Sequence, residues 1–322
     1  MTTAEIIPPW HVDVIVADGF VLTEMAAVVD ILRIANRVSA LPPFGWTYRS
    51  KNGGVVTASC DAFVNTENFV KRPDAHYAFV VGNSDPDSPA LSLGSMISSY
   101  TSRQGQVFLL AEAASRYIKD SGTEASAYTT HWENAEFLKE RSRHLEPNTA
   151  IASEHGGVIT CAGMETTVDV TLALIGRHVS SATKLTVANI LLHDKIRDFS
   201  TQQPFSGTKG TSTGDSELDQ CIEIMQVNFE DPLPIAELVE VMGMSNRSLE
   251  RKFKSHLGTT PNTFYRELRL AKANNLLVNT NMTVREVGLA CGFLNGFSGL
   301  YKSVYGMTPL ALRKRRRADY MA

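Results

Sequence analysis

The chain has 322 residues, of which 43% are hydrophobic, and its formal net charge is −3. This length suffices for two domains that each bury their own core. The opening "MTTAEIIPPW" lacks the charged start and apolar run of a signal peptide, and no apolar stretch reaches the ~20 residues of a membrane span. We therefore expect a cytoplasmic protein that does not enter a membrane.

Four cysteines, Cys60, Cys161, Cys221 and Cys291, are far apart in the chain and form no C-x-x-C pair. Neither a disulfide framework nor a structural zinc site is indicated, since both need closely or regularly spaced ligands. We expect reduced thiols, no metal site and no cofactor.

Residues 10–198 alternate short β-rich apolar runs with helix-like segments. Parallel strands need crossover helices and are buried on both faces, so this alternation is typical of a mostly parallel sheet. The sequence predicts an α/β domain with helices on both faces of the sheet, as in flavodoxin-like folds. The segments are HVDVIVADGF (11–20), EMAAVVDILRIANRV (24–38), WTYRS (46–50), HYAFVVGN (76–83), SLGSMISSYTSRQG (92–105), QVFLLAEAA (106–114), AYTTHW (127–132), AIASE (150–154), GVITCAG (157–163) and METTVDVTLALIGRHV (164–179).

A segment rich in Ser, Thr and Gly, "DFSTQQPFSGTKGTSTGD", begins at Asp198 and shows no apolar period. Such composition is typical of a linker. We place the linker at residues 199–215.

From Ser216 onward the pattern is helical, which predicts an all-α domain over residues 216–317. A capping box at Thr283 and Glu286 predicts a helix start, and Gly243 and Gly292 are suited to end two short amphipathic helices. One apolar stripe at steps of three or four predicts the first helix of this domain: Leu218, Cys221, Ile222, Met225 and Phe229.

This domain contains one unit twice. Gly243 and Gly292 correspond at an offset of 49, whereas Thr260-Pro261 and Thr308-Pro309 correspond at 48. Thr-Pro suits a helix start, with Thr as N-cap and Pro at the first helical position. Helix, glycine turn and helix is the plan of the helix-turn-helix motif, so we expect two such motifs.

The basic residues concentrate in the same segment. From Ser245 to Arg317 there are 14 Lys and Arg residues against three acidic ones. Such a domain is expected to bind a polyanion, because each neutralised phosphate releases counterions. A solvated basic face, or a plain basic tail at Arg313 to Arg317, is the alternative.

In the first unit, Ser245 is the expected cap of the recognition helix, and Leu249 and Phe253 are expected to face its core. Arg247 and Arg251, one turn apart, can each pair with guanine O6 and N7. The predicted DNA-binding residues of this unit are Asn246, Arg247, Ser248, Glu250, Arg251 and Lys254. Glu250 either accepts from cytosine or pairs with a neighbouring Arg.

Five cations of this region, among them Lys254, are expected to hold phosphates or face solvent. They are Lys252, Lys254, Arg266, Arg269 and Lys272.

Residues 216–317 resemble the DNA-binding domain of the AraC family, in which a long helix, here "NTFYRELRLAKANNLLVN", joins two helix-turn-helix units. The resemblance rests on "GMSNRSLERKFKSHLGTTP", "TVREVGLACGF" and "FSGLYKSVYGMTPLALR". It implies double-stranded DNA as partner, with two recognition helices in successive major-groove segments about 34 Å apart.

The second unit departs from the family pattern. The turn between Gly292-Phe293 and "FSG" is shorter than the family's usual turn and contains only Leu294, Asn295 and Gly296. Gly299 also replaces the usual Arg. Two glycines in a short helix cost about 1 kcal/mol each relative to Ala. We expect the second recognition helix to recognise bases more weakly, with Asn295, Ser298 and Lys302 contacting mainly the DNA backbone.

The first domain resembles the PfpI/ThiJ superfamily, which shares the fold of class I glutamine amidotransferases, in "DVIVADGF", "FVVGN", "QVFLLAEAASRYI", "TTHWE" and "GGVITCAG". Together with the AraC-type end, the chain resembles GlxA-type regulators. The superfamily's enzymes carry a nucleophilic Cys at a strand-to-helix elbow, which here falls at Ala111 to Ala113 and holds no cysteine. The resemblance therefore implies no catalytic residue and a catalytically silent ligand pocket.

By the same resemblance, Glu112 occupies or adjoins the nucleophile position, and the predicted ligand-binding residues are Glu24, Glu112, His131, Trp132 and Cys161. The alternatives are a structural hydrogen bond for His131, helix surface for Glu24, core for Cys161 and a helix cap for Glu112.

In GlxA-type regulators, an acidic residue at the elbow accompanies a response to cationic amines such as betaine, carnitine or arginine. We therefore expect Glu112, with an aromatic such as Trp132, to favour a positively charged small metabolite. The protein is expected to be a homodimeric transcription regulator. The rival interpretations are a cysteine hydrolase or amidase of the PfpI type, using Cys161 or Cys60, and a non-specific nucleic-acid or scaffold protein.

Overall fold

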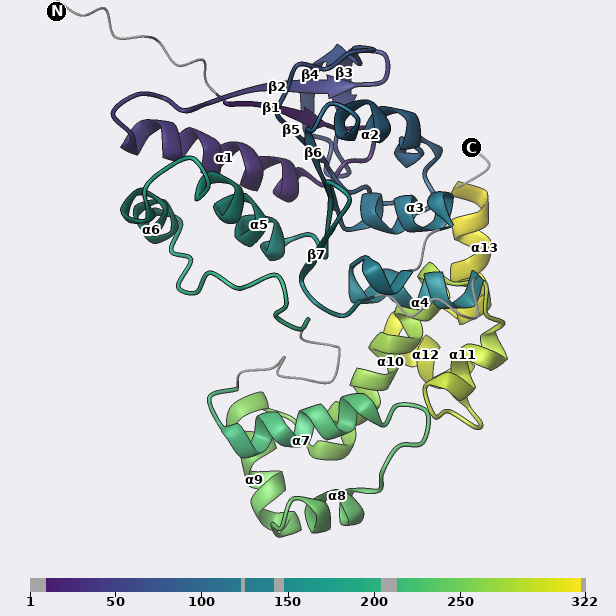
Figure 1. The fold of residues 1–322 in the computed structure, drawn as a ribbon. Helices are drawn as coiled ribbons and strands as arrows, with labels where there is room; N and C mark the ends of the chain where they lie inside the picture. Colours follow the sequence, from purple (N-terminus) through teal and green to yellow (C-terminus); the bar gives the residue numbers. More distant parts are fainter. Residues whose placement is uncertain (1–9, 123–124, 142–147, 204–212, 320–322) are drawn as a thin grey trace, which may run out of the picture. The chain divides into compact units, whose positions relative to one another are not determined.

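The structure, a computed structural model, describes residues 10–122, 125–141, 148–203 and 213–319. The chain forms two compact units, Met1–Gln202 and Gln203–Ala322, which we name the α/β unit and the helical unit (Figure 1). Their boundary falls inside the predicted linker 199–215, of which residues 204–212 lie outside the described residues.

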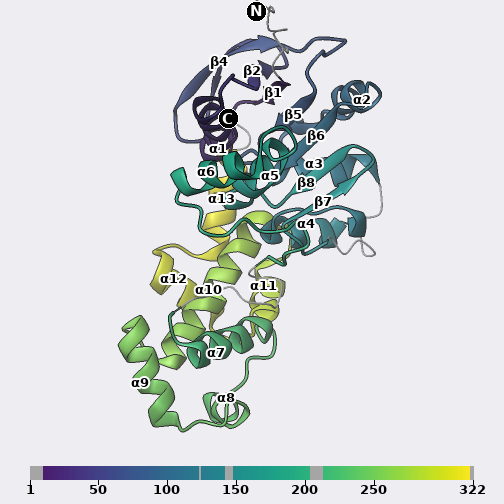
Figure 2. The same cartoon turned by 60° about the vertical axis from the view of Figure 1, so that its left-hand side comes forward.

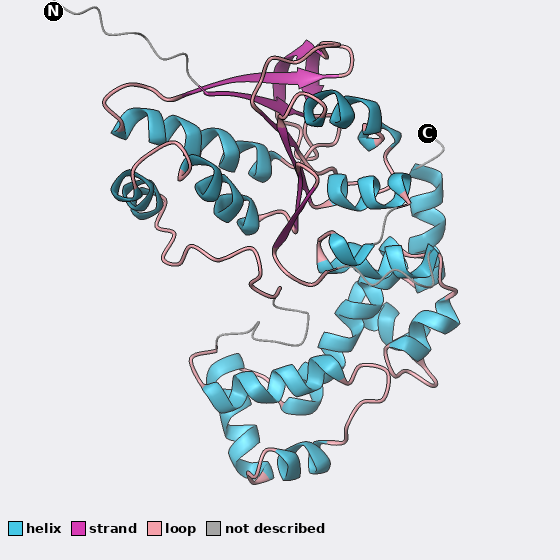
Figure 3. Ribbon diagram, in the orientation of Figure 1, coloured by secondary structure: helices cyan, strands magenta, loops and turns pink. Residues whose placement is uncertain are grey.

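A sheet forms the centre of the α/β unit and is magenta in Figure 3. It has eight strands in the order β3-β4-β2-β1-β5-β6-β8-β7. The six strands from β4 to β8 pair in parallel, while β3 with β4 and β7 with β8 form antiparallel hairpins at the two edges. The mostly parallel sheet predicted from the sequence is confirmed. The strands are β1 (Trp10–Ile15), β2 (Phe44–Ser50), β3 (Gly54–Thr57), β4 (Phe63–Asn68), β5 (Tyr77–Val80), β6 (Gln106–Leu110), β7 (Ala152–His155) and β8 (Val158–Cys161).

Helices cover both faces of the sheet, as predicted. Side chains alternate along β6, so that Phe108 and Leu110 join the core under α1, α5 and α6, whereas Val107 and Leu109 join the core under α2 and α3. Figure 2 shows α1, α5 and α6 side by side. The helices are α1 (Leu22–Val38), α2 (Gly94–Thr101), α3 (Glu112–Ser121), α4 (Trp132–Arg141), α5 (Glu165–Ile175) and α6 (Ser181–Ile190), with 3-10 turns η1 (Pro89–Leu91) and η2 (Ala125–Ala127).

One β-like run of the sequence is not a strand. Residues 127–132 contain the end of η2, an isolated bridge from Thr129 to Asn148, and the start of α4. The backbone N–H of Thr129 donates to the Thr160 hydroxyl at 2.8 Å. A side-chain partner thus satisfies this N–H where a neighbouring strand would otherwise be needed.

The helical unit contains two small cores that share one long helix, α10. Tyr265 in its first half joins the core of α7, α8 and α9, whereas Leu270, Ala273 and Leu276 join the core of α11 and α12. The prediction of an all-α domain is confirmed. The helices are α7 (Ser216–Val227), α8 (Ile235–Val241), α9 (Asn246–Leu257), α10 (Pro261–Asn279), α11 (Val284–Ala290), α12 (Phe297–Tyr305) and α13 (Pro309–Asp319).

The predicted helix signals take their expected places. The Ser245 and Thr260 side chains cap α9 and α10, and Thr283 forms a complete capping box with Glu286. Gly243 and Gly292 have φ values of 63° and 69°, which an L side chain rarely adopts. The first helix ends at Val227, so Phe229, the last member of the predicted stripe, lies in the loop that follows.

Within the described residues, no helix combines the length and apolar character needed to cross a bilayer.

Candidate ligand site and DNA-reading helices

A strained elbow joins β6 to α3. β6 ends at Leu110, Ala111 has φ 41° and ψ −106°, and α3 begins at Glu112. A positive φ is uncommon for a residue other than glycine and is often found at functional sites. The residue at the elbow is therefore Ala111, whose side chain is a methyl group, and Glu112 is the next residue in the chain.

Glu24, in the first turn of α1, is fully buried beside this elbow. Its carboxylate accepts hydrogen bonds from the backbone N–H of Gly82, at 2.8 Å, and of Met164, at 3.0 Å. Burial raises the pKa of Glu24 to about 7, the two N–H groups oppose the rise, and the Glu112 carboxylate adds to it. Glu24 is thus not the exposed helix-surface residue of the alternative interpretation.

The Glu112 carboxylate is mostly buried. Oε1 accepts from the Asn134 side chain at 3.3 Å, and Oε2 is buried with no hydrogen-bond partner among the described residues. Burial raises the pKa of Glu112, and nearby N–H groups moderate the rise. No cation forms an ion pair with Glu24 or Glu112 within the described part of the chain.

Two glycines hold the carboxylates close together. A Cβ on Gly82 would lie 2.5 Å from Glu112 Oε2 and 2.9 Å from Glu24 Oε2, so these oxygens are at most 5.4 Å apart. A Cβ on Gly163 would lie 2.3 Å from Glu24 Oε1. Sequence reasoning missed both positions, although a glycine directly after an apolar strand marks where a ligand can approach the backbone. We name the group Glu24, Gly82, Ala111, Glu112 and Gly163 the elbow site.

The other predicted ligand residues lie nearby in the chain or fold but differ in access. His131 and Trp132 are partly exposed at the start of α4, two to three residues before the Asn134 that contacts Glu112. Burial lowers the pKa of His131, and Glu133 opposes this change. Cys161 is fully buried next to the Thr166 hydroxyl, and burial raises its pKa to about 12. Ligand contact by these three residues stays a prediction.

A cavity of about 360 Å³ lies at the carboxyl ends of β1, β2 and β5. Polar and apolar groups line it in similar measure, and Asp18 and Lys51 are among its polar residues. None of the five predicted ligand residues lines it. The carboxyl edge of an open α/β sheet, where strand order reverses, is a common place for a ligand.

The first helix-turn-helix motif consists of α8, the four residues 242–245 and α9. Leu249 and Phe253 are fully buried in its core, as predicted. Ser248 is partly buried, and the other predicted DNA-binding residues of α9 are exposed, namely Asn246, Arg247, Glu250, Arg251 and Lys254. In the described part of the chain, neither Arg247 nor Arg251 forms an ion pair with a carboxylate.

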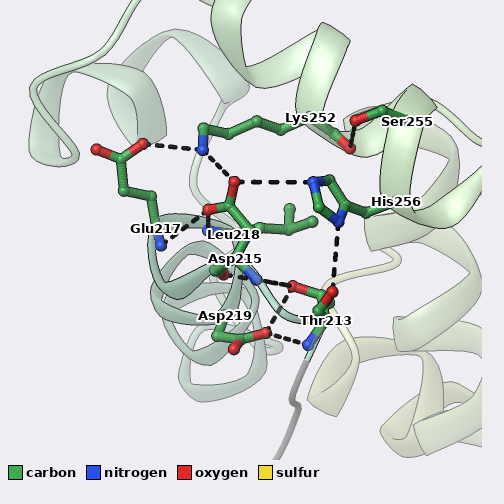
Figure 4. A network of polar contacts seen from close by, with 8 residues as sticks. All are labelled: Thr213, Asp215, Glu217, Leu218, Asp219, Lys252, Ser255 and His256. Atoms are coloured by element: carbon green, nitrogen blue, oxygen red, sulfur yellow. Dashed lines mark hydrogen bonds and ion pairs between the residues drawn. The ribbon is translucent and has the colours of Figure 1, made fainter.

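Two cations expected to hold phosphates or face solvent are instead engaged within the protein. Lys252 pairs with Asp215 and Glu217 at the start of α7 (Figure 4). Arg269 donates to the carbonyls of Cys291, at 2.9 Å, and Gly292, at 3.1 Å. Sequence spacing showed these positive charges but not the partners that the fold brings to them.

The second motif consists of α11, the six residues 291–296 and α12. α12 begins after Gly296, which has φ 74° and offers no side-chain cap, in contrast to Ser245 before α9. Asn295, Ser298 and Lys302 are exposed. Their contact with DNA, and the weaker reading expected of this unit, stay predictions.

Comparison with known proteins finds similarity over both units. Residues 238–315 match a family model described as a helix-turn-helix domain. The transcriptional regulator GlxA of Rhizobium meliloti is 28% identical over 92% of this chain and 93% of its own length. The regulator GbdR of Pseudomonas aeruginosa is 26% identical over 94% of this chain and 83% of its own length. A solved AraC-family regulator from Pseudomonas putida aligns with 57% of this chain and 100% of its own, at 20% identity and a TM-score of 0.49.

The chain is therefore a DNA-binding transcriptional regulator, with an α/β unit ahead of two helix-turn-helix motifs. Over most of its length it is similar to the regulators GlxA and GbdR, and its helix-turn-helix domain matches the family model over residues 238–315.

Proposed function

We propose that this regulator is controlled by a small cationic metabolite that binds at the elbow site without being chemically converted. It acts as a homodimer in the cytoplasm, and the bound metabolite changes how the helical unit engages DNA. Such control requires different ligand affinities in the DNA-competent and DNA-incompetent states.

The unpaired carboxylates of the elbow site carry the proposal. Other buried acids of the α/β unit have cationic partners: Asp13 lies 2.8 Å from Arg49, and Asp169 lies 2.7 Å from Arg197. Glu24 and Glu112 have only neutral hydrogen-bond donors. Buried charges are normally paired, so a ligand ammonium or guanidinium supplies the missing positive charge.

The partly exposed rings of His131 and Trp132 support the same ligand class. Their centroids are 5.4 Å apart at the start of α4, whose Asn134 contacts Glu112. A cation near the carboxylates is also attracted to the face of an indole ring, and Trp is the strongest such partner.

The absence of bond-making chemistry is inferred from the elbow and from Cys161. Thioester formation needs a thiolate at the elbow, and Ala111 provides only a methyl group there. The Cys161 thiol is buried with a pKa near 12, so it stays protonated at neutral pH. Thiol-dependent turnover by the purified protein that disappears in Cys161→Ser would overturn this part of the proposal.

Calorimetric titration of the full-length protein with amines, amino acids and quaternary ammonium compounds tests the ligand class. A cation should bind more tightly as pH rises from 5 to 8, because Glu24, with its pKa near 7, becomes ionised over this range. Binding should release protons, and Glu112→Gln should weaken it by tenfold or more, roughly the effect of losing a buried charged partner.

Glu67→Gln is the matched control, since it removes an exposed carboxylate of β4 and should leave binding unchanged. Selective binding of a neutral or anionic compound, unaffected by Glu112→Gln, would contradict the proposal. Loss of that binding in Lys51→Met would then assign the ligand to the cavity beside β1, β2 and β5.

A further inference from the structure

The C-terminal end of the predicted linker is fastened to the recognition helix of the first motif. Asp215 caps α7 through Oδ1, which accepts from the backbone N–H of Glu217 and Leu218, each at 3.1 Å. Its other oxygen, Oδ2, accepts from Lys252 Nζ in the middle of α9 (Figure 4). Glu217 Oε2 lies 3.0 Å from the same Nζ. One ammonium group therefore links two helices.

His256, one turn after Lys252, makes a second connection. Its Nδ1 lies 3.3 Å from the carbonyl oxygen of Thr213, and Nε2 lies 3.8 Å from Asp215 Oδ2. Thr213 in turn donates to Asp219 Oδ1 from its backbone, at 2.7 Å, and from its hydroxyl, at 2.8 Å (Figure 4). We name Thr213, Asp215, Glu217, Lys252 and His256 the staple.

The staple contacts α9 on a different side from the one that carries its exposed arginines. Successive residues of a helix are 100° apart, so Lys252 and His256 lie on one side, next to the buried Leu249. Arg247 lies about 140° around the helix from Lys252. Arg251 lies about 100° around the helix from Lys252, so the contacts hold α9 on its flank and leave the side that carries the arginines exposed.

The two partners of the ion pair are partly buried. The side chains of Lys252 and Asp215 are each only 18% exposed. Hydrogen bonding to Lys252 lowers the pKa of Asp215, and hydrogen bonding to Asp215 raises that of Lys252. Both groups thus stay charged at neutral pH. A sheltered pair is screened less by salt than an exposed one, and can hold a fixed geometry.

We propose that Lys252 is a positioning residue for DNA recognition: through Asp215 it sets the rotation of α9 about its axis, which aims Arg247 and Arg251 at base edges. The inference rests on the assignment of α9 as a reading helix. It makes the last linker residues a part of the reading unit. Base recognition depends on this rotation, because bidentate contacts tolerate little misplacement.

Fluorescence anisotropy of the full-length protein at several salt concentrations tests this role. The probes are a duplex that wild-type protein selects from random sequence and a shuffled duplex. Lys252→Met keeps the aliphatic stem, and Asp215→Asn keeps a good N-cap. Both should weaken binding to the selected duplex roughly five- to tenfold, as expected for a partly lost base contact, with binding to the shuffled duplex unchanged. Lys252→Arg should restore most of the preference.

The salt dependence separates positioning from direct contact. Binding weakens with salt, so the slope of log K against log salt is negative. Loss of one phosphate contact reduces the magnitude of this slope by about 0.9, whereas loss of a positioning residue leaves the slope unchanged. Lys254→Met, an exposed lysine two residues along, is the control expected to lower the slope. Thermal melting by circular dichroism identifies any variant that fails to fold. If Lys252→Met does not fold, the binding of Asp215→Asn to the two duplexes tests the proposal instead.

Two results would overturn the proposal: a slope reduced by about 0.9 in Lys252→Met, or an unchanged preference for the selected duplex in both variants. A wild-type protein that selects no duplex would instead overturn the assignment of α9 as a reading helix, and the staple's role with it.

Discussion

The two units use charge in opposite ways. In the α/β unit, carboxylates such as Glu24 are withdrawn from water, whereas in the helical unit Arg247 and Arg251 are exposed. A desolvated charge discriminates among small ligands, because an unmatched partner leaves it uncompensated. Exposed cations attract a polyanion over a distance and respond to salt. The difference suits one unit to sense a small molecule and the other to bind DNA.

A similar contrast separates the second helices of the two motifs, α9 and α12. α9 begins with a side-chain cap at Ser245 and is held on its flank by Lys252, while α12 begins after Gly296 without a side-chain cap and contains Gly299. α8 and α11 differ in chain position by 49 residues, but the starts of α9 and α12 differ by 51. The longer turn shortens α12 to 9 residues, against 12 in α9.

The largest effect is expected at the buried carboxylate, which tests the α/β side of the comparison. The pKa of Glu24 is about 7 in the folded state against 4.5 ordinarily, so folding favours the protonated form. Its stabilising contribution is complete below pH 4.5 and lost as pH rises through about 7. The loss amounts to roughly 3 kcal/mol.

Urea unfolding between pH 4.5 and 8, followed by tryptophan fluorescence, measures this loss. All three tryptophans, Trp10, Trp46 and Trp132, belong to the α/β unit, so the signal reports that unit alone. Glu24→Gln should lack the pH-dependent loss, and Asp30→Asn, an exposed acid of α1, should retain it. If the free energy of unfolding changes with pH in the same way in wild type and Glu24→Gln, the Glu24 carboxylate is not the buried group without a cationic partner described above.

The next effect concerns the exposed arginines of α9. Arg247→Ala and Arg251→Ala should each weaken binding to a specific duplex by about 1 to 3 kcal/mol and weaken binding to random DNA less. Competition assays at fixed salt measure both. Equal losses on the two duplexes would reassign these residues to phosphate contacts.

A smaller effect sharpens the contrast between the reading helices. Gly299 lies inside α12 and has open space around its Cα, so Gly299→Ala should stabilise the helical unit by up to about 1 kcal/mol. Gly258→Ala is the matched control, because Gly258 also has open space but a φ of 70°, and should destabilise. Thermal melting of both variants checks the pair. A destabilised Gly299→Ala would show that this glycine is needed for packing.

The smallest effect is expected at Lys302 of α12. Lys302→Ala should lower the slope of log K against log salt by about 0.9 and weaken specific and random duplexes alike. A selective loss on the specific duplex would show that α12 reads bases, and would remove the proposed asymmetry between the motifs.

Local signals predicted much of this fold. The helix starts at Thr260 and Thr283 and the glycine turns at Gly243 and Gly292 follow from residues within one or two turns of each other. The alternation of strands and helices likewise predicted the parallel sheet. The hairpin of β3 and β4 was missed, because its short strands give only a weak period-2 pattern.

The sites depend on contacts between distant residues, which the sequence pattern does not contain. Glu24 and Glu112 are 88 positions apart and meet because β1 and β6 flank β5 in the sheet. The elbow position itself was predicted only to within Ala111 to Ala113, and the positive φ of Ala111 identifies it. Lys252 was expected to hold phosphate or face solvent, because helix spacing does not reveal its partner Asp215, 37 positions earlier.

The most direct test of the account is a selection of binding sites from random duplexes by the full-length protein and by the Arg247→Ala, Arg251→Ala double variant. The account predicts that wild type enriches one motif containing guanines, and that the double variant still binds duplex DNA at low salt but enriches no such motif. Enrichment of the same motif by both proteins would contradict the claim that α9 reads the bases.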